Sequence, residues 1–252
     1  MSLARWLRPS AGRLEDRALR VRKANKILAV LTEELGGDLA NLTCLDVGCS
    51  AGLITERLAQ RFRLTVGVEL DANALAGRER SDAIGLYFIC GDGERLPLQD
   101  HSVDVVICAQ VYEHVGDTRR LFAEIDRVLA PGGVCFFSGP NKWFPIEMHT
   151  GLPLLHWLPR PWAVALSRRL GRGEYDVRPL TIGALRRRLY AFEIKDYTLA
   201  MLREPQTYSC ADELGGLAWI GSLPGWLLKW LLPLTPNVNW ILRPKGAGHG
   251  CL

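Results

Sequence analysis

The sequence lacks the cysteine patterns from which proteins build metal sites and disulfide frames. Its seven cysteines are an odd number, and no two of them have CxxC spacing. Four of them lie inside or beside apolar runs of the kind that form strands, namely Cys44, Cys90, Cys108 and Cys135. We therefore expect small buried thiols in a reducing compartment, with neither a structural disulfide nor a bound metal.

The chain also has no recognisable secretory leader and little net charge. Residues 1–6 contain no apolar segment of the kind that a signal peptide needs, so we expect a cytoplasmic protein. The net charge of +4 is too small to indicate a nucleic-acid partner by itself. Basic side chains crowd residues 5–26, where they indicate either a solvated helix face or contact with an acidic lipid or substrate.

What the sequence does have is a regular alternation of strand and helix patterns over residues 14–140, the predicted core. Five short apolar runs predict strands at 42–47, 64–70, 85–90, 103–109 and 134–138. Periodic apolar residues predict helices between them. Strands that alternate with helices predict a parallel sheet covered by helices on both faces.

Beyond Pro140 the alternation stops. The remaining regular elements are a helix and two strands, predicted at 180–190, 192–200 and 237–243. The two strands could close a seven-stranded, mostly parallel sheet with an antiparallel edge. Between these elements, segments 143–178 and 205–236 are expected to be helical and loop insertions that form a lid over the substrate chamber. We expect residues 1–252 to form a single domain.

The first predicted strand ends in a glycine loop, GCSAG at residues 48–52. Open parallel sheets bind ligands beyond the carboxyl ends of their strands, and glycine lets the backbone turn sharply and approach a ligand closely. The spacing is Gly-x-x-x-Gly, whereas dinucleotide sites normally have Gly-x-Gly-x-x-Gly. This difference leaves an NAD(P)-dependent oxidoreductase as the weaker interpretation.

Two acidic residues follow neighbouring predicted strands. Glu69 closes the second strand, where its carboxylate could accept hydrogen bonds from both hydroxyls of a ribose. Asp92 follows the third strand, where it could accept a hydrogen bond from an adenine amino group. Each motif alone is equally typical of a tight turn, but their agreement in register favours a nucleotide-like cofactor.

Four sequence blocks between Leu45 and Pro140 resemble the Methyltransferase type 11 branch of class I S-adenosylmethionine-dependent methyltransferases. The blocks are LDVGCSAG, VGVELD, GDGERLPLQDHSVDVVICAQVYEHV and RVLAPGG followed by SGPN. Ubiquinone, menaquinone and sterol methyltransferases are related to this branch. The resemblance implies a Rossmann-like α/β fold, S-adenosyl-L-methionine as the cofactor and methyl transfer as the activity.

The resemblance also implies a set of cofactor-binding residues. In this family pattern they are Asp46, Gly48, Cys49, Ser50, Gly52, Glu69, Leu70, Asp92, Gly93 and Gln110. The residues up to Gly52 would shape the pocket for the methionine moiety, and Glu69 would bind the ribose. Leu70 would pack near the adenine, with Asp92 and Gly93 at its end, and Gln110 would lie beside the sulfonium. The chain departs from the family in having Ser-Ala at 50–51 for Gly-Ser or Gly-Thr, and Glu at 69 for Asp.

The sequence disfavours nucleic acid as the methyl acceptor. Enzymes that methylate adenine amino groups resemble one another in an Asn/Asp-Pro-Pro-Tyr/Phe motif after the fourth strand, where this chain has AQVY at 109–112. Cytosine C5 enzymes use a nucleophilic cysteine next to proline, and Cys108 has no such neighbour. A small molecule is therefore the expected acceptor.

Three residues are candidates for catalysis. His149, with Glu147 beside it, follows the fifth predicted strand, where the acceptor chamber is expected, and the pair could act as a general base. His114 follows the fourth strand, where related sequences commonly carry Glu-His, so a structural role near the cofactor is an equal interpretation. An oxygen acceptor usually needs a base, whereas an activated carbon needs less help.

The second half of the chain is rich in tryptophan and poor in charge. Seven of the eight tryptophans follow residue 140, and between Glu213 and Arg243 the one charged residue is Lys229. Within residues 217–234, Pro224 can start a helix and Pro233 must end it. The predicted helix therefore has about 9 residues, far fewer than the ~20 of a membrane span. The segment either docks on the inner membrane face as a peripheral contact or packs on the sheet as a lid.

We therefore expect methyl transfer to an oxygen or carbon atom of a partly hydrophobic small molecule, of the lipid, isoprenoid quinone, polyketide or glycolipid type. A catalytically silent subunit that keeps the fold and binds the cofactor is the main alternative, because a fold alone does not fix a function.

Overall fold

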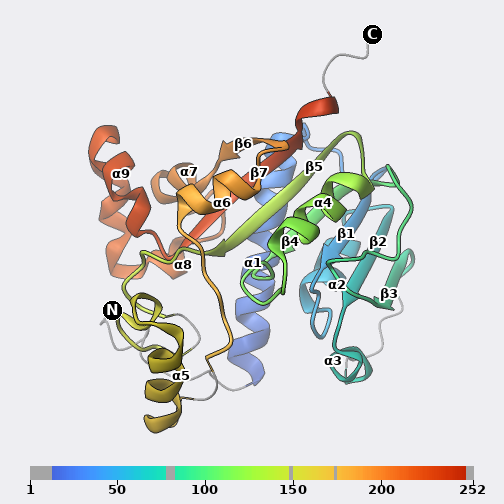
Figure 1. The fold of residues 1–252 in the computed structure, drawn as a ribbon. Helices are drawn as coiled ribbons and strands as arrows, with labels where there is room; N and C mark the ends of the chain where they lie inside the picture. Colours follow the sequence, from blue (N-terminus) through green and yellow to red (C-terminus); the bar gives the residue numbers. More distant parts are fainter. Residues whose placement is uncertain (1–12, 78–82, 148–149, 173–174, 248–252) are drawn as a thin grey trace.

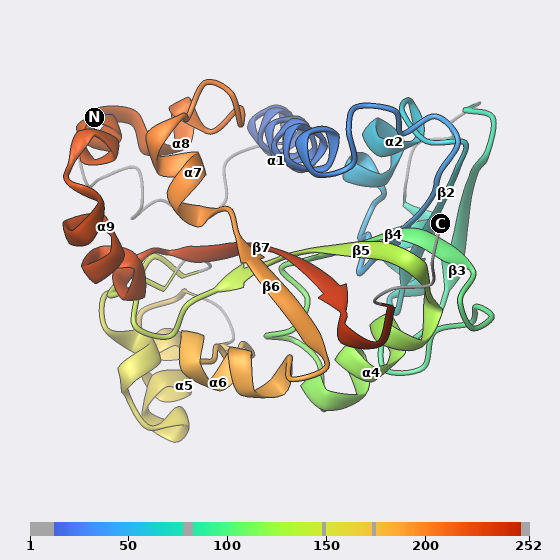
Figure 2. The same cartoon turned by 90° about the horizontal axis from the view of Figure 1, so that it is seen from above.

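The computed structural model describes residues 13–77, 83–147, 150–172 and 175–247, and shows a seven-stranded sheet between two layers of helices (Figures 1 and 2). The strands are β1 (Thr43–Val47), β2 (Leu64–Glu69), β3 (Leu86–Cys90), β4 (Val103–Ala109), β5 (Leu129–Pro140), β6 (Phe192–Asp196) and β7 (Asn237–Pro244). Their order is β3-β2-β1-β4-β5-β7-β6, with β7 antiparallel to both of its neighbours. This confirms the predicted Rossmann-like α/β fold with an antiparallel edge.

Helices cover both faces of the sheet. They are α1 (Arg13–Glu34), α2 (Leu53–Ala59), α3 (Ala72–Ala76), α4 (Thr118–Val128), α5 (Arg160–Arg169), α6 (Ile182–Arg188), α7 (Thr198–Arg203), α8 (Ala211–Leu214) and α9 (Gly225–Leu231). Figure 2 shows α4 and α6 on one face of the sheet and α1, α2 and α7 on the other. The sheet is thus buried on both sides at its centre.

Strand β4, at the centre of the sheet, shows why the sequence of a central strand is continuously apolar. Its side chains alternate between two fully buried clusters, with Val106 facing α4 and α6, and Ile107 facing α1 and α2. Each buried aliphatic side chain of this size contributes about 1.5 to 3 kcal/mol of transfer free energy. Because both faces are covered, the site residues at the ends of the central strands stand on a rigid support.

The structure corrects three predictions of local structure. The strand predicted over 192–200 ends at Asp196, whose carboxylate accepts a hydrogen bond from Thr198 N at 2.9 Å, and α7 follows. Strand β5 begins at Leu129 rather than at residue 134. Cys90 is exposed because β3 is an edge strand, whereas Cys44, Cys108 and Cys135 are fully buried as predicted.

The two predicted insertions lie outside the sheet, at the end toward which β5 runs (Figure 1). In the first, α5 packs through Ala163 on a small separate core that includes Leu155 and Tyr175. In the second, α9 begins after Pro224 and ends before Pro233, as predicted. Among the described residues, no helix has both the length and the apolar composition of a membrane span.

Candidate active site

The turn between β1 and α2 depends on left-handed backbone conformations. Gly48, Ser50 and Gly52 have φ angles of 69°, 51° and 80°. The backbone N–H groups of Gly48 and Cys49 both donate to Val68 O, at 2.8 and 3.2 Å, which ties the turn to β2. Left-handed conformations are open to glycine at little cost, so the two glycines of the predicted loop are explained by the backbone itself.

Close packing beside the same turn leaves no room for side chains at three positions. A Cβ atom at Gly48 would lie 2.6 Å from Val111 Cγ2, and one at Gly52 would lie 2.6 Å from the Phe88 ring. A Cβ atom at Gly67 in β2 would lie 2.8 Å from the sulfur of Cys49. The glycines therefore let these side chains pack directly on the backbone turn, which we call the glycine cradle, at the carboxyl ends of β1 and β2.

Glu69 stands at the end of β2 and faces this cradle. Its Oε2 accepts a hydrogen bond from Ser50 N at 2.8 Å, and its Oε1 accepts one from Asp71 N at 3.0 Å. Two backbone donors fix the carboxylate in place, and each oxygen keeps a further lone pair for an external hydroxyl. Leu70 is 69% exposed, so its side chain offers an apolar surface beside that carboxylate.

Asp46 lies beneath the glycine turn, at the end of β1. It is buried, and its Oδ2 accepts a hydrogen bond from Thr55 Oγ1 of α2 at 2.6 Å. Burial raises the pKa of Asp46 to about 7, and this shift is opposed by the hydrogen bond from Thr55 and the charge of Arg20 on α1. Asp46 thus joins β1 to α2 directly under the cradle.

The loop after β3 holds the predicted Asp92 and Gly93 and a residue that sequence reasoning missed. Asp92 is exposed, and its Oδ1 accepts a hydrogen bond from Glu94 N at 2.8 Å. Glu94 Oε1 accepts hydrogen bonds from Gly116 N at 2.6 Å and Asp117 N at 3.0 Å. Glu94 therefore joins the loop after β3 to the loop after β4, a role that no local pattern indicates because its partners are distant in sequence.

Gln110 follows β4 directly, as predicted, and has a φ angle of 63°. Its backbone N–H donates to Ser138 O at 2.8 Å, and its side-chain amide donates to Asn237 Oδ1 at 3.2 Å. The residue is thus held between the ends of β5 and β7, at the edge of the sheet that also carries the glycine cradle.

Tyr112 and Glu113, next in the chain, are buried side chains that the sequence analysis did not single out as site residues. The Tyr112 hydroxyl donates to Pro140 O and accepts a hydrogen bond from Leu180 N at 3.1 Å. Among the described residues, neither carboxylate oxygen of Glu113 has a hydrogen-bond partner on another residue. Burial raises the pKa of Glu113 to about 8, and Lys23 of α1 opposes the shift. A buried charged carboxylate without partners is costly, so burial favours the protonated form of Glu113.

His114 and Glu147, two of the three predicted catalytic residues, each have a different neighbour in the structure. His114 is partly exposed, with Nδ1 3.6 Å from Asp176 Oδ2. Glu147 is buried in the turn 147–152, where its carboxylate accepts a hydrogen bond from Thr150 N. His149 lies outside the described residues. Among the described residues, no group of three or more His, Cys, Asp or Glu is arranged to hold a metal ion.

Residues 45–137 match a family described as a methyltransferase domain. The ubiquinone biosynthesis O-methyltransferase of Coxiella burnetii is 29% identical over 109 residues, which are 42% of this chain and 47% of that protein. An uncharacterized methyltransferase of Mycobacterium sp. strain JLS is 40% identical over 116 residues, which are 46% of this chain and 45% of that protein. The match thus spans slightly less than half the length of these relatives.

The fold is shared with a solved structure over most of the chain. The S-adenosylmethionine-dependent methyltransferase of Mesorhizobium loti aligns with a TM-score of 0.54 and 18% identity. The alignment covers 82% of this chain and 92% of that one. The likeness in sequence is concentrated in the segment that builds the cradle, and the likeness in fold extends well beyond it.

Proposed function

We propose that the chain, whose residues 45–137 match a methyltransferase domain, transfers a methyl group from S-adenosyl-L-methionine to a small molecule. The observation that carries the proposal is the left-handed turn of Gly48, Ser50 and Gly52, whose backbone holds the carboxylate of Glu69 at the end of β2. Glycines let the main chain of such a turn approach a ligand closely, and the carboxylate supplies acceptors for hydroxyl groups.

The residues present fit this cofactor. Glu69 would hold the ribose through its free lone pairs, and Leu70 would pack on the adenine, with Asp92 at the adenine edge. The turn over buried Asp46 would hold the methionine end, and Gln110 would lie near the sulfonium. The cofactor supplies a methyl group that the positive sulfur already activates, so the protein has mainly to align the acceptor and exclude water.

We propose a partly hydrophobic acceptor, of the lipid, isoprenoid quinone, polyketide or glycolipid type, that is methylated on oxygen or carbon. Support comes from segment 143–178, which follows the carboxyl end of β5, and from segment 205–236, which immediately precedes β7. Both segments carry exposed aromatic side chains. A cytoplasmic chain in peripheral contact with the membrane through residues 217–234 would reach such an acceptor directly.

We propose Glu113 as the group that receives a proton from an oxygen acceptor, in addition to His149, Glu147 and His114. Its buried carboxylate has no partner on another described residue, and because burial raises its pKa to about 8, the group is mainly ionised and able to accept a proton above that pH. In Glu113→Gln, turnover should fall strongly while cofactor affinity stays near normal. His149→Ala is the parallel test, and unchanged turnover would remove the residue concerned from the mechanism.

The proposed function is tested by calorimetric titration of the full chain with S-adenosyl-L-methionine and with NAD. Binding of the methyl donor alone, weakened at least tenfold in Glu69→Ala, is the expected result. Binding of NAD alone would replace the proposal with an oxidoreductase. Labelled methyl groups are then followed into a panel of phenolic, quinone and fatty-acyl acceptors, and labelling only in the presence of a second protein would indicate a silent subunit.

A further inference from the structure

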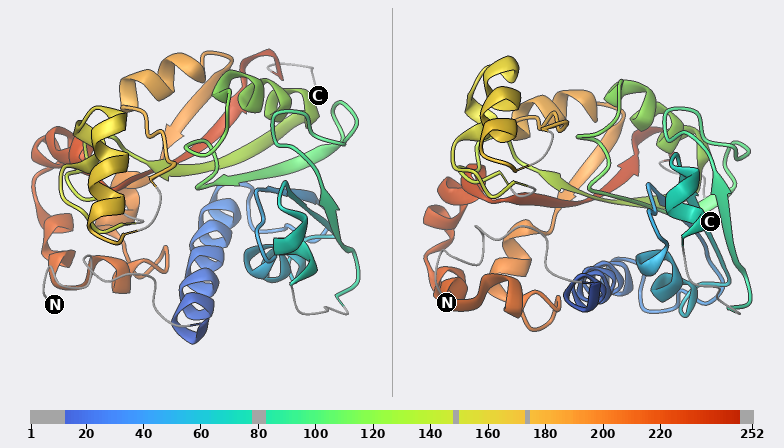
Figure 3. Two further views of the ribbon diagram at one scale, coloured as in Figure 1. Left: turned by 60° about the horizontal axis from the view of Figure 1, so that its bottom comes forward. Right: turned by 90° about the horizontal axis from the view of Figure 1, so that it is seen from below.

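Most of the tryptophans lie on the surface at one end of the molecule. Of the seven described, only Trp240 is buried, and the others are 46 to 72% exposed. The exposed ones are Trp143, Trp157, Trp162, Trp219, Trp226 and Trp230. All six belong to segments 143–178 and 205–236, which lie together at one end of the sheet (Figures 1 and 3). Exposed apolar surface on this scale marks a site of interaction.

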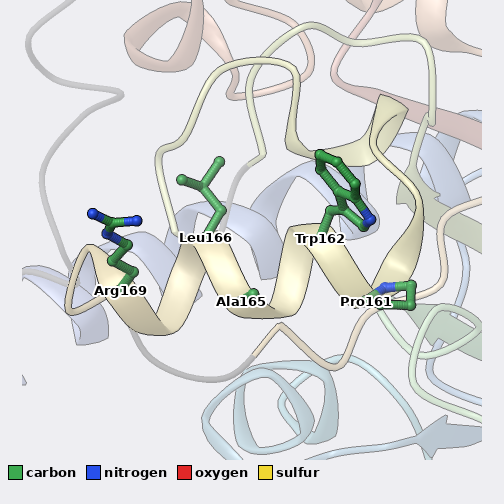
Figure 4. A pocket seen from close by; sticks show the side chains of 5 residues that line it. All are labelled: Pro161, Trp162, Ala165, Leu166 and Arg169. Atoms are coloured by element: carbon green, nitrogen blue, oxygen red, sulfur yellow. The ribbon is translucent and has the colours of Figure 1, made fainter.

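Helix α5 presents its apolar side outward. Trp162 and Leu166, four residues apart, are 71% and 36% exposed, and Arg169 follows on the same face (Figure 4). With Pro161 and Ala165 they line a shallow hollow of about 460 Å³. The inner side of the helix consists of small residues, since it is Ala163 and Ser167 that are fully buried.

Helix α9 repeats this arrangement. Trp226 and Trp230, again four residues apart, are 72% and 71% exposed, and Lys229 is exposed between them. Leu228 is the residue that anchors the helix, at 1% exposure. The large side chains predicted to form either a lid core or a membrane contact therefore point away from the protein.

Basic side chains accompany the exposed tryptophans of α5 and α9. Between Glu147 and Glu174 the sequence has no acidic residue and four arginines, which are Arg160, Arg168, Arg169 and Arg172. Between Glu213 and the end of segment 205–236 the one charged residue is Lys229, next to Trp230 on α9. Tryptophans at the interface and basic side chains at the headgroups are the combination that suits an anionic bilayer.

A short connection fixes the two segments to each other. The Asn141 side-chain amide donates to Pro233 O at 2.5 Å and to Thr235 O at 3.3 Å, just beyond α9. On the other side, Trp157 Nε1 donates to Lys142 O at 3.1 Å, and the rings of Trp143 and Trp157 are 5.9 Å apart. The segment that leads to α5 and the end of α9 are thus anchored on the same few residues.

We propose that α5 and α9 together dock the chain on the surface of an anionic phospholipid bilayer. The sequence had suggested a membrane contact through tryptophan for residues 217–234, and α5 with its arginines adds a second surface. The purpose of this contact rests on the proposed function: docking would bring an acceptor dissolved in the bilayer to the carboxyl edge of the sheet. Docking itself requires no methyl transfer.

The test is co-sedimentation of the full chain with vesicles of phosphatidylglycerol and phosphatidylcholine, compared with vesicles of phosphatidylcholine alone. We expect binding to the anionic vesicles that weakens at high salt. Trp162→Ser/Leu166→Ser on α5 and Trp226→Ser/Trp230→Ser on α9 should each lower the partition coefficient at least tenfold. Arg168→Gln/Arg169→Gln should lower it about fivefold for each charge. Tyr190→Ser, at a site 76% exposed outside both segments, is the matched control and should bind like the wild type.

Three outcomes would overturn the inference. The chain could stay in the supernatant with both kinds of vesicle, or the α5 variants could bind as tightly as the wild type while the α9 variants do not. The third is a self-association, measured by sedimentation equilibrium, that the tryptophan variants abolish while vesicle binding is unchanged. Cofactor titration of the same samples separates the two proposals, because a chain that binds vesicles but not S-adenosyl-L-methionine refutes the proposed function alone.

Discussion

Replacement of Gly52 by alanine tests the cofactor cradle most directly. Two costs follow from the structure. A φ of 80° costs an L-residue about 1 to 2 kcal/mol, and a Cβ atom 2.6 Å from the Phe88 ring adds about 1 to 3 kcal/mol of overpacking. Gly52→Ala should therefore lower the free energy of unfolding by about 2 to 5 kcal/mol and weaken cofactor binding.

Gly132 provides a control with almost the same backbone. Its φ is 81°, and nothing lies within 4 Å of a Cβ atom added there. Gly132→Ala should lose only the conformational cost, about 1 to 2 kcal/mol, and should bind the cofactor normally. Urea unfolding followed by circular dichroism measures both variants, with equal m-values required for the comparison.

A double-mutant cycle with Phe88→Ala isolates the steric part. If the clash is the cause, Gly52→Ala costs about 1 to 3 kcal/mol less in the Phe88→Ala background than in the wild type. Equal losses for Gly52→Ala and Gly132→Ala, or no coupling with Phe88, would refute the claim that close approach selects glycine at this position.

Three further substitutions probe the supports of the site. Burial raises the pKa of Asp46 from 3.8 to about 7, so the free energy of unfolding should fall by about 4 kcal/mol as the pH rises from 4 toward 7 and the buried carboxyl ionises. Asp46→Asn should remove this decline, which urea unfolding at several pH values measures. Tyr112→Phe removes two buried hydrogen bonds and should lower stability by about 1 to 3 kcal/mol, also measured with urea. Glu94→Ala should lower the free energy of unfolding by about 1 kcal/mol, and Glu94→Gln, which keeps an acceptor oxygen, should lower it less. Equal shifts in melting temperature for the two variants would contradict the role of Glu94 in joining the two loops.

The sequence predicts the sheet because its central strands are buried on both faces. A strand such as β4 must then be continuously apolar, and that run is visible without any structure. The glycine turn and Glu69 are predictable for a similar reason, since backbone conformation and a carboxylate at a strand end leave a local signature.

Contacts between distant segments leave no such signature. Glu94 accepts hydrogen bonds from residues 22 and 23 positions away, and Tyr112 from a residue 68 positions away. Glu113 likewise contacts a residue far away in the sequence, because its backbone carbonyl accepts a hydrogen bond from Arg178 N at 2.8 Å. The end of β6 was mispredicted because Tyr197 and Met201 continue an apolar pattern, while a single hydrogen bond from Thr198 to Asp196 begins a helix there.

The Tyr112 hydroxyl joins the two ends of the first insertion, segment 143–178. One oxygen holds Pro140 and Leu180, the two residues at which the chain leaves and re-enters the neighbourhood of the sheet, and an isolated bridge between Asn141 and Leu180 closes the same neck. The chain between them contains α5, which packs on a core of its own. Because this core is separate from the core of the sheet, we expect the segment between 141 and 180 to be exchangeable without moving a strand. Grafting the corresponding segment of a relative into this neck would transfer acceptor preference while the cofactor cradle stays as it is.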